Sequence, residues 1–165
     1  MPGHPDRHER GRLLPTSYYL RACGTVLEAL RQLGTPFVVR LHTEVPPGRY
    51  TLHPGMAGLY FPLHAPATVD PSEYSLHDFA ALPHLETVVN VEPREALDDF
   101  ATADVLLLSR SSLGYVGGWL NPHGLVIYAP WWHAPLPGWL VADQHGNLDT
   151  VEVASRIGDH VRRRG

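Results

Sequence analysis

Residues 104–128 read DVLLLSRSSLGYVGGWLNPHGLVIY, two apolar runs separated by a polar turn and a short glycine-containing segment. The run over 104–108 is apolar after its first aspartate, and the run over 125–128 is apolar throughout. An unbroken apolar run is typical of a parallel strand that is buried on both faces. The stretch therefore predicts two buried strands, joined by a turn at 109–112 and a short helix over 113–120.

Further elements alternate on both sides of this stretch. Residues 87–91 have the character of a strand, and residues 93–103 that of a helix with Pro93 at a permitted first-turn position. Apolar residues spaced by three and four predict an earlier helix from Thr16 to the residue before Gly34. A last helical pattern closes the chain.

Alternating strands and helices with short links predict a sheet that is covered by helices and connected by right-handed crossovers. With a further strand expected over 37–42, we predict an α/β fold, a three-layer Rossmann-like domain with a mainly parallel sheet of about four or five strands. Residues 1–14 are expected to form a flexible arm and residues 15–165 the domain. Prolines interrupt residues 43–85 and leave room only for short strands there.

The composition of the 165 residues limits the class of protein. Hydrophobic residues make up 44% and charged residues 18%, which is typical of one globular domain with a core. A net charge of −4 argues against a broad nucleic-acid binder, because such proteins usually carry a basic face. No apolar run is long enough to span a membrane, so we expect a cytoplasmic protein.

Histidine and cysteine do not fall into a ligand pattern. The 11 histidines are scattered without the compact spacing of a metal site, and the single cysteine, Cys23, excludes a disulfide framework. Cys23 lies in an apolar helical pattern, which indicates an inert buried thiol. We therefore predict no metal and no cofactor.

The polar turn is the first candidate site. A buried strand ends in three hydroxyls and one guanidinium, Ser109 to Ser112, and a helix begins immediately afterwards. In open parallel sheets, ligands collect at the carboxyl ends of strands, and a helix amino terminus favours phosphate. The alternative is an ordinary helix cap, since serine is preferred there whatever the function.

The second candidate site is aromatic. Asn121-Pro-His-Gly124 and Trp131-Trp132-His133 flank the strand at 125–128 on either side. Loop tryptophans beside a sheet are unusual, because their large apolar area is normally buried, and one interpretation is a wall on which a base or sugar stacks. The alternative is a loop that folds back over the core as a lid.

Two enzyme signatures are missing. The serines do not stand in a G-x-S-x-G motif, although a small hydrolase that combines a serine with a histidine remains a further alternative. Gly114, Gly117 and Gly118 lie within the helix and do not form the G-x-G-x-x-G fingerprint of dinucleotide binding.

The block of residues 103–116 with Leu120-Asn-Pro122 and the segment Trp131–Trp139 resembles the C-terminal, donor-binding half of fucosyltransferase-like glycosyltransferases. Residues 12–20 are similar to the segment that opens this half. That family has two Rossmann-like domains in the GT-B arrangement and uses a nucleotide-diphosphate sugar without a metal. The resemblance implies a nucleotide-sugar-binding domain over 15–165, with a donor such as GDP-fucose.

The resemblance also implies roles for individual residues. Ser111 and Ser112 match the diphosphate-contacting serines, and Asp104 matches the aspartate before the buried strand. The expected guanine-reading acidic position is occupied here by Ala96, with Glu95 and Asp98 nearby. The substrate-binding residues that we predict are Ser109, Arg110, Ser111, Ser112, Tyr115, Trp131, Trp132 and His133, and no catalytic residue is assigned.

The chain departs from the family in its first residues. The family motif His-x-Arg-Arg-Gly-Asp is replaced by His8-Glu-Arg-Gly-Arg12, which lacks the second arginine and the aspartate. A two-domain transferase is also longer than 165 residues, so the alternatives are a fragment of a transferase that lacks its N-terminal domain, a domain that works with a partner, and a non-catalytic relative. The alternative function is a non-catalytic Rossmann-like interaction module that uses the Trp131-Trp132 loop.

Overall fold

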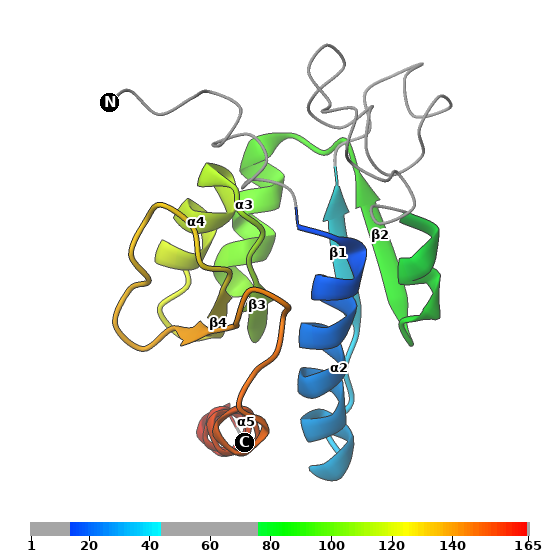
Figure 1. Cartoon of the computed structure of the whole chain (residues 1–165), viewed down its shortest axis with the longest axis vertical. Coiled ribbons are helices and arrows are strands. Elements are labelled where there is room, and N and C mark those ends of the chain that lie inside the picture. The colour runs from blue at the N-terminus through cyan, green and yellow to red at the C-terminus, as the bar shows by residue number, and fades with distance from the viewer. Residues whose placement is uncertain (1–13, 44–75, 165) are drawn as a thin grey trace.

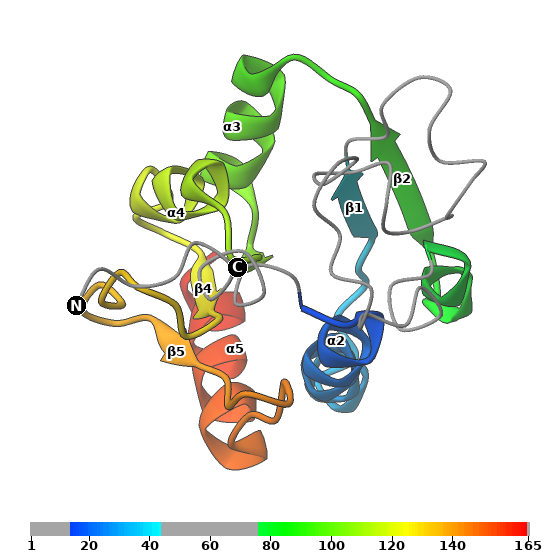
Figure 2. The same ribbon diagram turned by 45° about the horizontal axis from the view of Figure 1, so that its top comes forward.

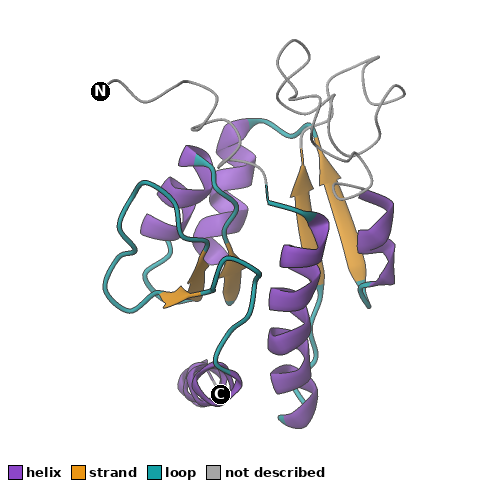
Figure 3. Cartoon of the chain, in the orientation of Figure 1, coloured by secondary structure: helices purple, strands orange, loops and turns teal. Residues whose placement is uncertain are grey.

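The computed structural model of the chain describes residues 14–43 and 76–164 (Figure 1). These residues form four α-helices, one short 3-10 helix and five strands: α2 (Thr16–Gln32), β1 (Val39–Thr43), η2 (Leu76–Ala81), β2 (Leu85–Val89), α3 (Pro93–Thr102), β3 (Val105–Leu107), α4 (Ser112–Trp119), β4 (Leu125–Tyr128), β5 (Leu140–Val141) and α5 (Thr150–Arg164). The mixture of helices and strands confirms the predicted α/β class (Figure 3).

Every strand pairing in the described residues is parallel, as expected, but the strands form two sheets. β1 pairs with β2 in one sheet, and the other has the order β3-β4-β5. The single sheet of four or five strands is therefore replaced by a pair of smaller ones. β1 contacts α3 through side chains. The ring of His42 on β1 lies 4.9 Å from the ring of Phe100 on α3, and the His42 Nε2 is 3.1 Å from a carboxylate oxygen of Asp99.

β4 is the centre of the three-stranded sheet. All four of its residues are buried, whereas β3, for which burial on both faces was also predicted, lies at an edge of this sheet. Successive side chains of a strand point to opposite faces. The apolar run of β3 is nonetheless explained, because Leu106 packs on one side and Val105 and Leu107 contact the core on the other.

Helices cover both faces of this sheet (Figure 2). Leu125 and Ile127 of β4 join a core with residues of α2 and α5, including Tyr18 and Ile157. On the other face, Val126 and Tyr128 join Leu106 and Leu108 in a second core. Side chains of α3 and α4 and of the aromatic loop pack against that second core: Phe100, Tyr115, Trp131 and Trp139.

The long helix and the apolar strand were predicted closely, whereas two short elements were not predicted. The expected helix beginning at Thr16 is α2, which ends at Gln32, and β4 has the predicted bounds. The two-residue strand β5 and the helix η2 were missed. The expected arm lies outside the described residues except for Leu14, which is buried in the core. Residues 44–75, most of the segment that left room for short strands, also lie outside them.

Candidate functional site

The serine turn lies between β3 and α4, at the carboxyl end of a parallel strand. After β3 the backbone continues alongside β4, since the N–H of Leu108 donates to the carbonyl of Ile127 at 2.9 Å. The chain then turns tightly, and the N–H of Ser111 donates to the carbonyl of Ser109 at 2.8 Å. Ser109 and Ser112 are exposed, and Arg110 and Ser111 are half-buried.

Ser111 is the cap of α4. Its backbone is extended, and its side-chain oxygen accepts a hydrogen bond from the N–H of Gly114 at 3.3 Å. This is the capping role that serine commonly has at a helix start. A hydroxyl that accepts one bond still has a proton to donate. Capping and ligand binding by Ser111 are therefore compatible.

Two segments that are distant in sequence share an electrostatic environment with the turn. The phenol of Tyr18, in the first turn of α2, is buried, and burial raises its pKa to about 12. The nearby charges act in opposite directions on that pKa, because Arg110 lowers it and Asp143 raises it. Arg110, Tyr18 and Asp143 therefore share one electrostatic environment, although the sequence analysis did not connect them.

The loop after β5 packs directly on α2. The Asp143 carboxylate accepts hydrogen bonds from the N–H of His145 at 2.7 Å and of Asn147 at 2.9 Å. These bonds, with one from the Asn147 side chain, lower the pKa of Asp143. Gly146 has a φ of +84°, and a Cβ there would lie 2.3 Å from the Tyr18 carbonyl oxygen. Only glycine fits this close contact.

Three of the predicted aromatic site residues form one stack. The ring of His133 lies between Tyr115 of α4, with centroids 4.6 Å apart, and Trp132, with centroids 4.0 Å apart. The Tyr115 hydroxyl donates to the carbonyl of Ala134 at 2.9 Å, and the Tyr128 hydroxyl donates to that of His133 at 2.5 Å. These bonds hold the loop against α4 and β4, and they hold His133 between two rings.

The tryptophan loop after β4 combines features of the lid and of the aromatic wall that its sequence suggested. Trp131 and Trp139 pack against the second core, as a lid over it does. Trp139 lies close under α4, where a Cβ added to Gly118 would be 2.9 Å from its ring. Trp132, in contrast, is 66% exposed at the outer end of the stack.

Asn121–Gly124 is not part of this aromatic surface. The segment precedes β4 and the tryptophan loop follows it, so the two lie at opposite ends of that strand. Asp104 likewise lies at the other end of β3 from the serines. The Asp104 carboxylate contacts two side chains of α5, His160 through Nε2 at 2.9 Å and Arg164 through a guanidinium nitrogen at 2.6 Å.

Few contacts within residues 14–43 and 76–164 fit a metal site or a hydrolase that combines a serine with a histidine. Within this part of the chain, no three His, Cys, Asp or Glu side chains are grouped so that they could hold a metal ion. Neither Ser111 nor Ser112 has a histidine as a hydrogen-bond partner there. Burial raises the pKa of the Cys23 thiol to about 11, so it stays protonated at neutral pH. No helix in these residues is both long and apolar enough to cross a membrane.

In comparisons with known proteins, no family model, no curated protein and no solved structure matches this chain.

Proposed function

We propose that the chain is a nucleotide-sugar-binding domain of glycosyltransferase type, which holds the donor diphosphate at the turn Ser109–Ser112. The observation that carries the proposal is the position of this turn at the carboxyl end of a parallel strand and the amino terminus of α4. The parallel strands, with helices on both faces of the β3-β4-β5 sheet, support a Rossmann-like arrangement.

The turn offers a diphosphate several kinds of donor. The first N–H groups of α4 have no partners within the helix, and the helix dipole adds a partial positive charge there. The exposed hydroxyl of Ser112 and the free proton of the Ser111 hydroxyl add two donors. The guanidinium of Arg110 supplies a full charge, and Arg contacts to phosphate oxygens are often bidentate.

The aromatic stack supplies a surface for the rest of the donor. Tyr115 belongs to α4, the helix that the serines begin, and His133 and Trp132 extend outward from it. Rings of this kind bind the face of a base or sugar. If transfer occurs, Arg110 would offset the charge of the departing diphosphate, and an N-terminal half would supply the acceptor.

Calorimetric titration of the chain with GDP, UDP and guanosine tests this proposal. A diphosphate site at the turn gives saturable heat with a nucleoside diphosphate and much weaker binding of guanosine. The absence of saturable binding by both GDP and UDP would contradict the proposal for this chain.

The exposure of Trp132 favours a second candidate, an interaction module without a nucleotide ligand. Tryptophan is enriched among the residues that dominate protein interfaces, and 66% of this side chain is exposed. Under this candidate, the same titration gives no saturable heat with either diphosphate. Trp132→Ala would then remove the interaction and leave the fold unchanged.

A further inference from the structure

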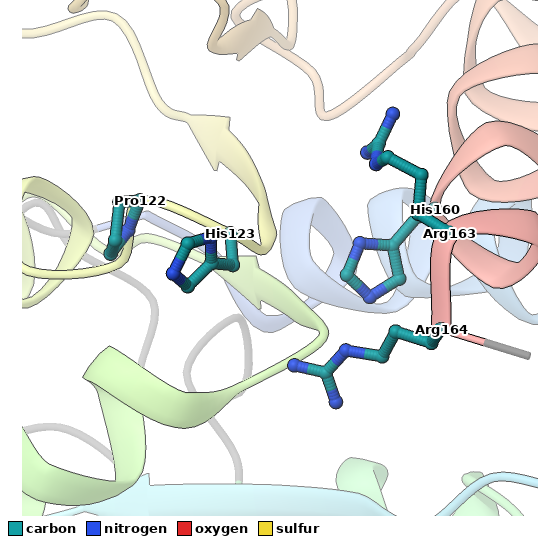
Figure 4. Close-up of a pocket in the computed structure, with 5 residues that line it drawn as sticks. All are labelled: Pro122, His123, His160, Arg163 and Arg164. Carbon is teal, nitrogen blue, oxygen red and sulfur yellow. The ribbon is translucent and has the colours of Figure 1, made fainter.

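A cavity of about 390 Å³ lies at the end of the molecule away from the serine turn. It is lined by Pro122, His123, His160, Arg163 and Arg164. Figure 4 shows Pro122 and His123 on one side and His160, Arg163 and Arg164 on the other, with the His160 and Arg164 side chains directed toward the space between them. Four of its five lining residues are therefore basic side chains.

The His123 side of the cavity is held by a buried asparagine. The side-chain NH₂ of Asn121 donates to the carbonyls of Phe100 and Ala103, each at 2.8 Å. Its carbonyl oxygen accepts the N–H of Gly124 at 2.7 Å. These bonds tie the turn between α4 and β4 to the end of α3, so they fix the backbone from which His123 projects.

The other side is the last turn of α5. Arg162 pairs with Asp159 at 2.5 Å, and Arg164 pairs with Asp104 at 2.6 Å. His160 is buried, and its Nε2 contacts the same Asp104 oxygen at 2.9 Å. Arg163 forms no ion pair or hydrogen bond with any residue that the structure describes. Of the two arginines that line the cavity, only Arg164 has a carboxylate partner among the described residues, so the cavity keeps an excess of positive charge.

A purely structural explanation accounts for only part of this arrangement. Arginines in the last turn of a helix offset the negative end of its dipole, and the contacts of Asp104 join α5 to β3. Neither role brings His123, from a different element, to the same cavity as Arg163. The convergence of basic side chains from two elements is what an anion site requires.

We propose that this cavity binds a small molecule through a phosphate monoester group. Guanidinium groups match phosphate oxygens in geometry, and imidazole N–H groups add donors. The volume is within the range of small-molecule sites, so the cavity can hold an organic group beside the phosphate. The proposal is independent of the nucleotide-sugar function, because none of the lining residues belongs to the serine turn or the aromatic stack.

Imidazole NMR of the whole chain tests the proposal, with inorganic phosphate and glycerol 3-phosphate as probes and acetate as the comparison. The expected result is saturable movement of the His123 and His160 signals with both phosphates and little movement with acetate. Arg163→Ala should weaken phosphate binding about tenfold, because it removes a charge-assisted contact. Asp104→Asn should tighten it, since that change removes the negative charge.

Arg162→Ala is the matched control, because it removes the same charge from the same turn without touching the cavity. It should leave the phosphate-dependent shifts of the His123 and His160 signals nearly unchanged. An absence of saturable shifts, or an equal response to acetate, would overturn the proposal. So would equal weakening by Arg162→Ala and Arg163→Ala, or weaker binding by Asp104→Asn with amide spectra that show an intact fold.

Discussion

The hydroxyl oxygen of Ser111 accepts a hydrogen bond from the backbone N–H of Gly114 across 3.3 Å. This contact begins α4, and it places the neighbouring Ser112 at the first helical position with an exposed side chain. The two serines therefore differ in what they contribute to the fold. That difference allows stability and ligand binding to be separated by single substitutions.

Ser111→Ala should lower the free energy of unfolding by about 0.5–2 kcal/mol, because it removes the cap of α4. Ser112→Ala should change it by less than about 0.5 kcal/mol, since the side chain is exposed and has no hydrogen-bond partner among the described residues. Urea denaturation of both variants beside the wild type measures this difference. Equal losses of stability would contradict the assignment of the cap to Ser111.

Ile127→Ala should lower the free energy of unfolding by about 2–5 kcal/mol, because Ile127 is buried at the centre of β4 and truncation leaves a cavity. Val151→Ala is the control, since Val151 is 77% exposed on α5 and should cost less than about 0.5 kcal/mol. Thermal and urea unfolding measure both. A small effect at Ile127 would be incompatible with β4 as the core strand.

Gly124→Ala should destabilise the chain by about 1–3 kcal/mol or more, because its Cβ would lie 2.2 Å from the Ala103 carbonyl oxygen. Gly24→Ala, within α2, meets no atom within 4 Å and should stabilise the chain by about 0.5–1 kcal/mol. Melting curves of the two variants should shift in opposite directions. A shared direction would contradict the close packing of the turn at 121–124.

The main elements could be predicted from the sequence because their signals are local. The apolar run of β4 is short and lies between turns, so it predicts a buried strand. The spacing of Tyr19, Val26 and Leu30 is that of a helix. β5 has only two residues and therefore has no periodicity to detect. The division into two sheets depends on strand pairing, which a local pattern does not contain.

The candidate site divides in the same way. Ser111 and Ser112 could be placed at a helix start from their neighbours alone. Tyr18 and Asp143 approach Arg110 only through the packing of α2 and of the loop after β5. The partners of Asp104 on α5, His160 and Arg164, are equally distant in sequence, so no local pattern around Asp104 indicates them.

The stability of the chain should fall as the pH rises through the range of about 10 to 12. The folded-state pKa of Tyr18 is about 12, whereas its ordinary value is 10.0, so the fold favours the protonated phenol. This contribution is fully present below pH 10 and is lost as the pH rises toward 12. Urea denaturation across this range measures the decrease.

Tyr18→Phe should flatten that pH dependence. The Tyr18 hydroxyl has no hydrogen-bond partner among the described residues, so its removal should not destabilise the chain at neutral pH. A loss of more than about 1 kcal/mol at neutral pH would show that the hydroxyl is bonded in solution.

The most direct test of the central claim is the GDP affinity of Arg110→Ala and Ser112→Ala, measured by calorimetry beside the wild type. Each variant should bind GDP about tenfold more weakly, because a charge-assisted contact to the diphosphate is lost. Arg94→Ala, an exposed arginine of α3, is the control and should bind like the wild type. Unchanged GDP affinity in both site variants, or no GDP binding by the wild type, would contradict a diphosphate site at this turn.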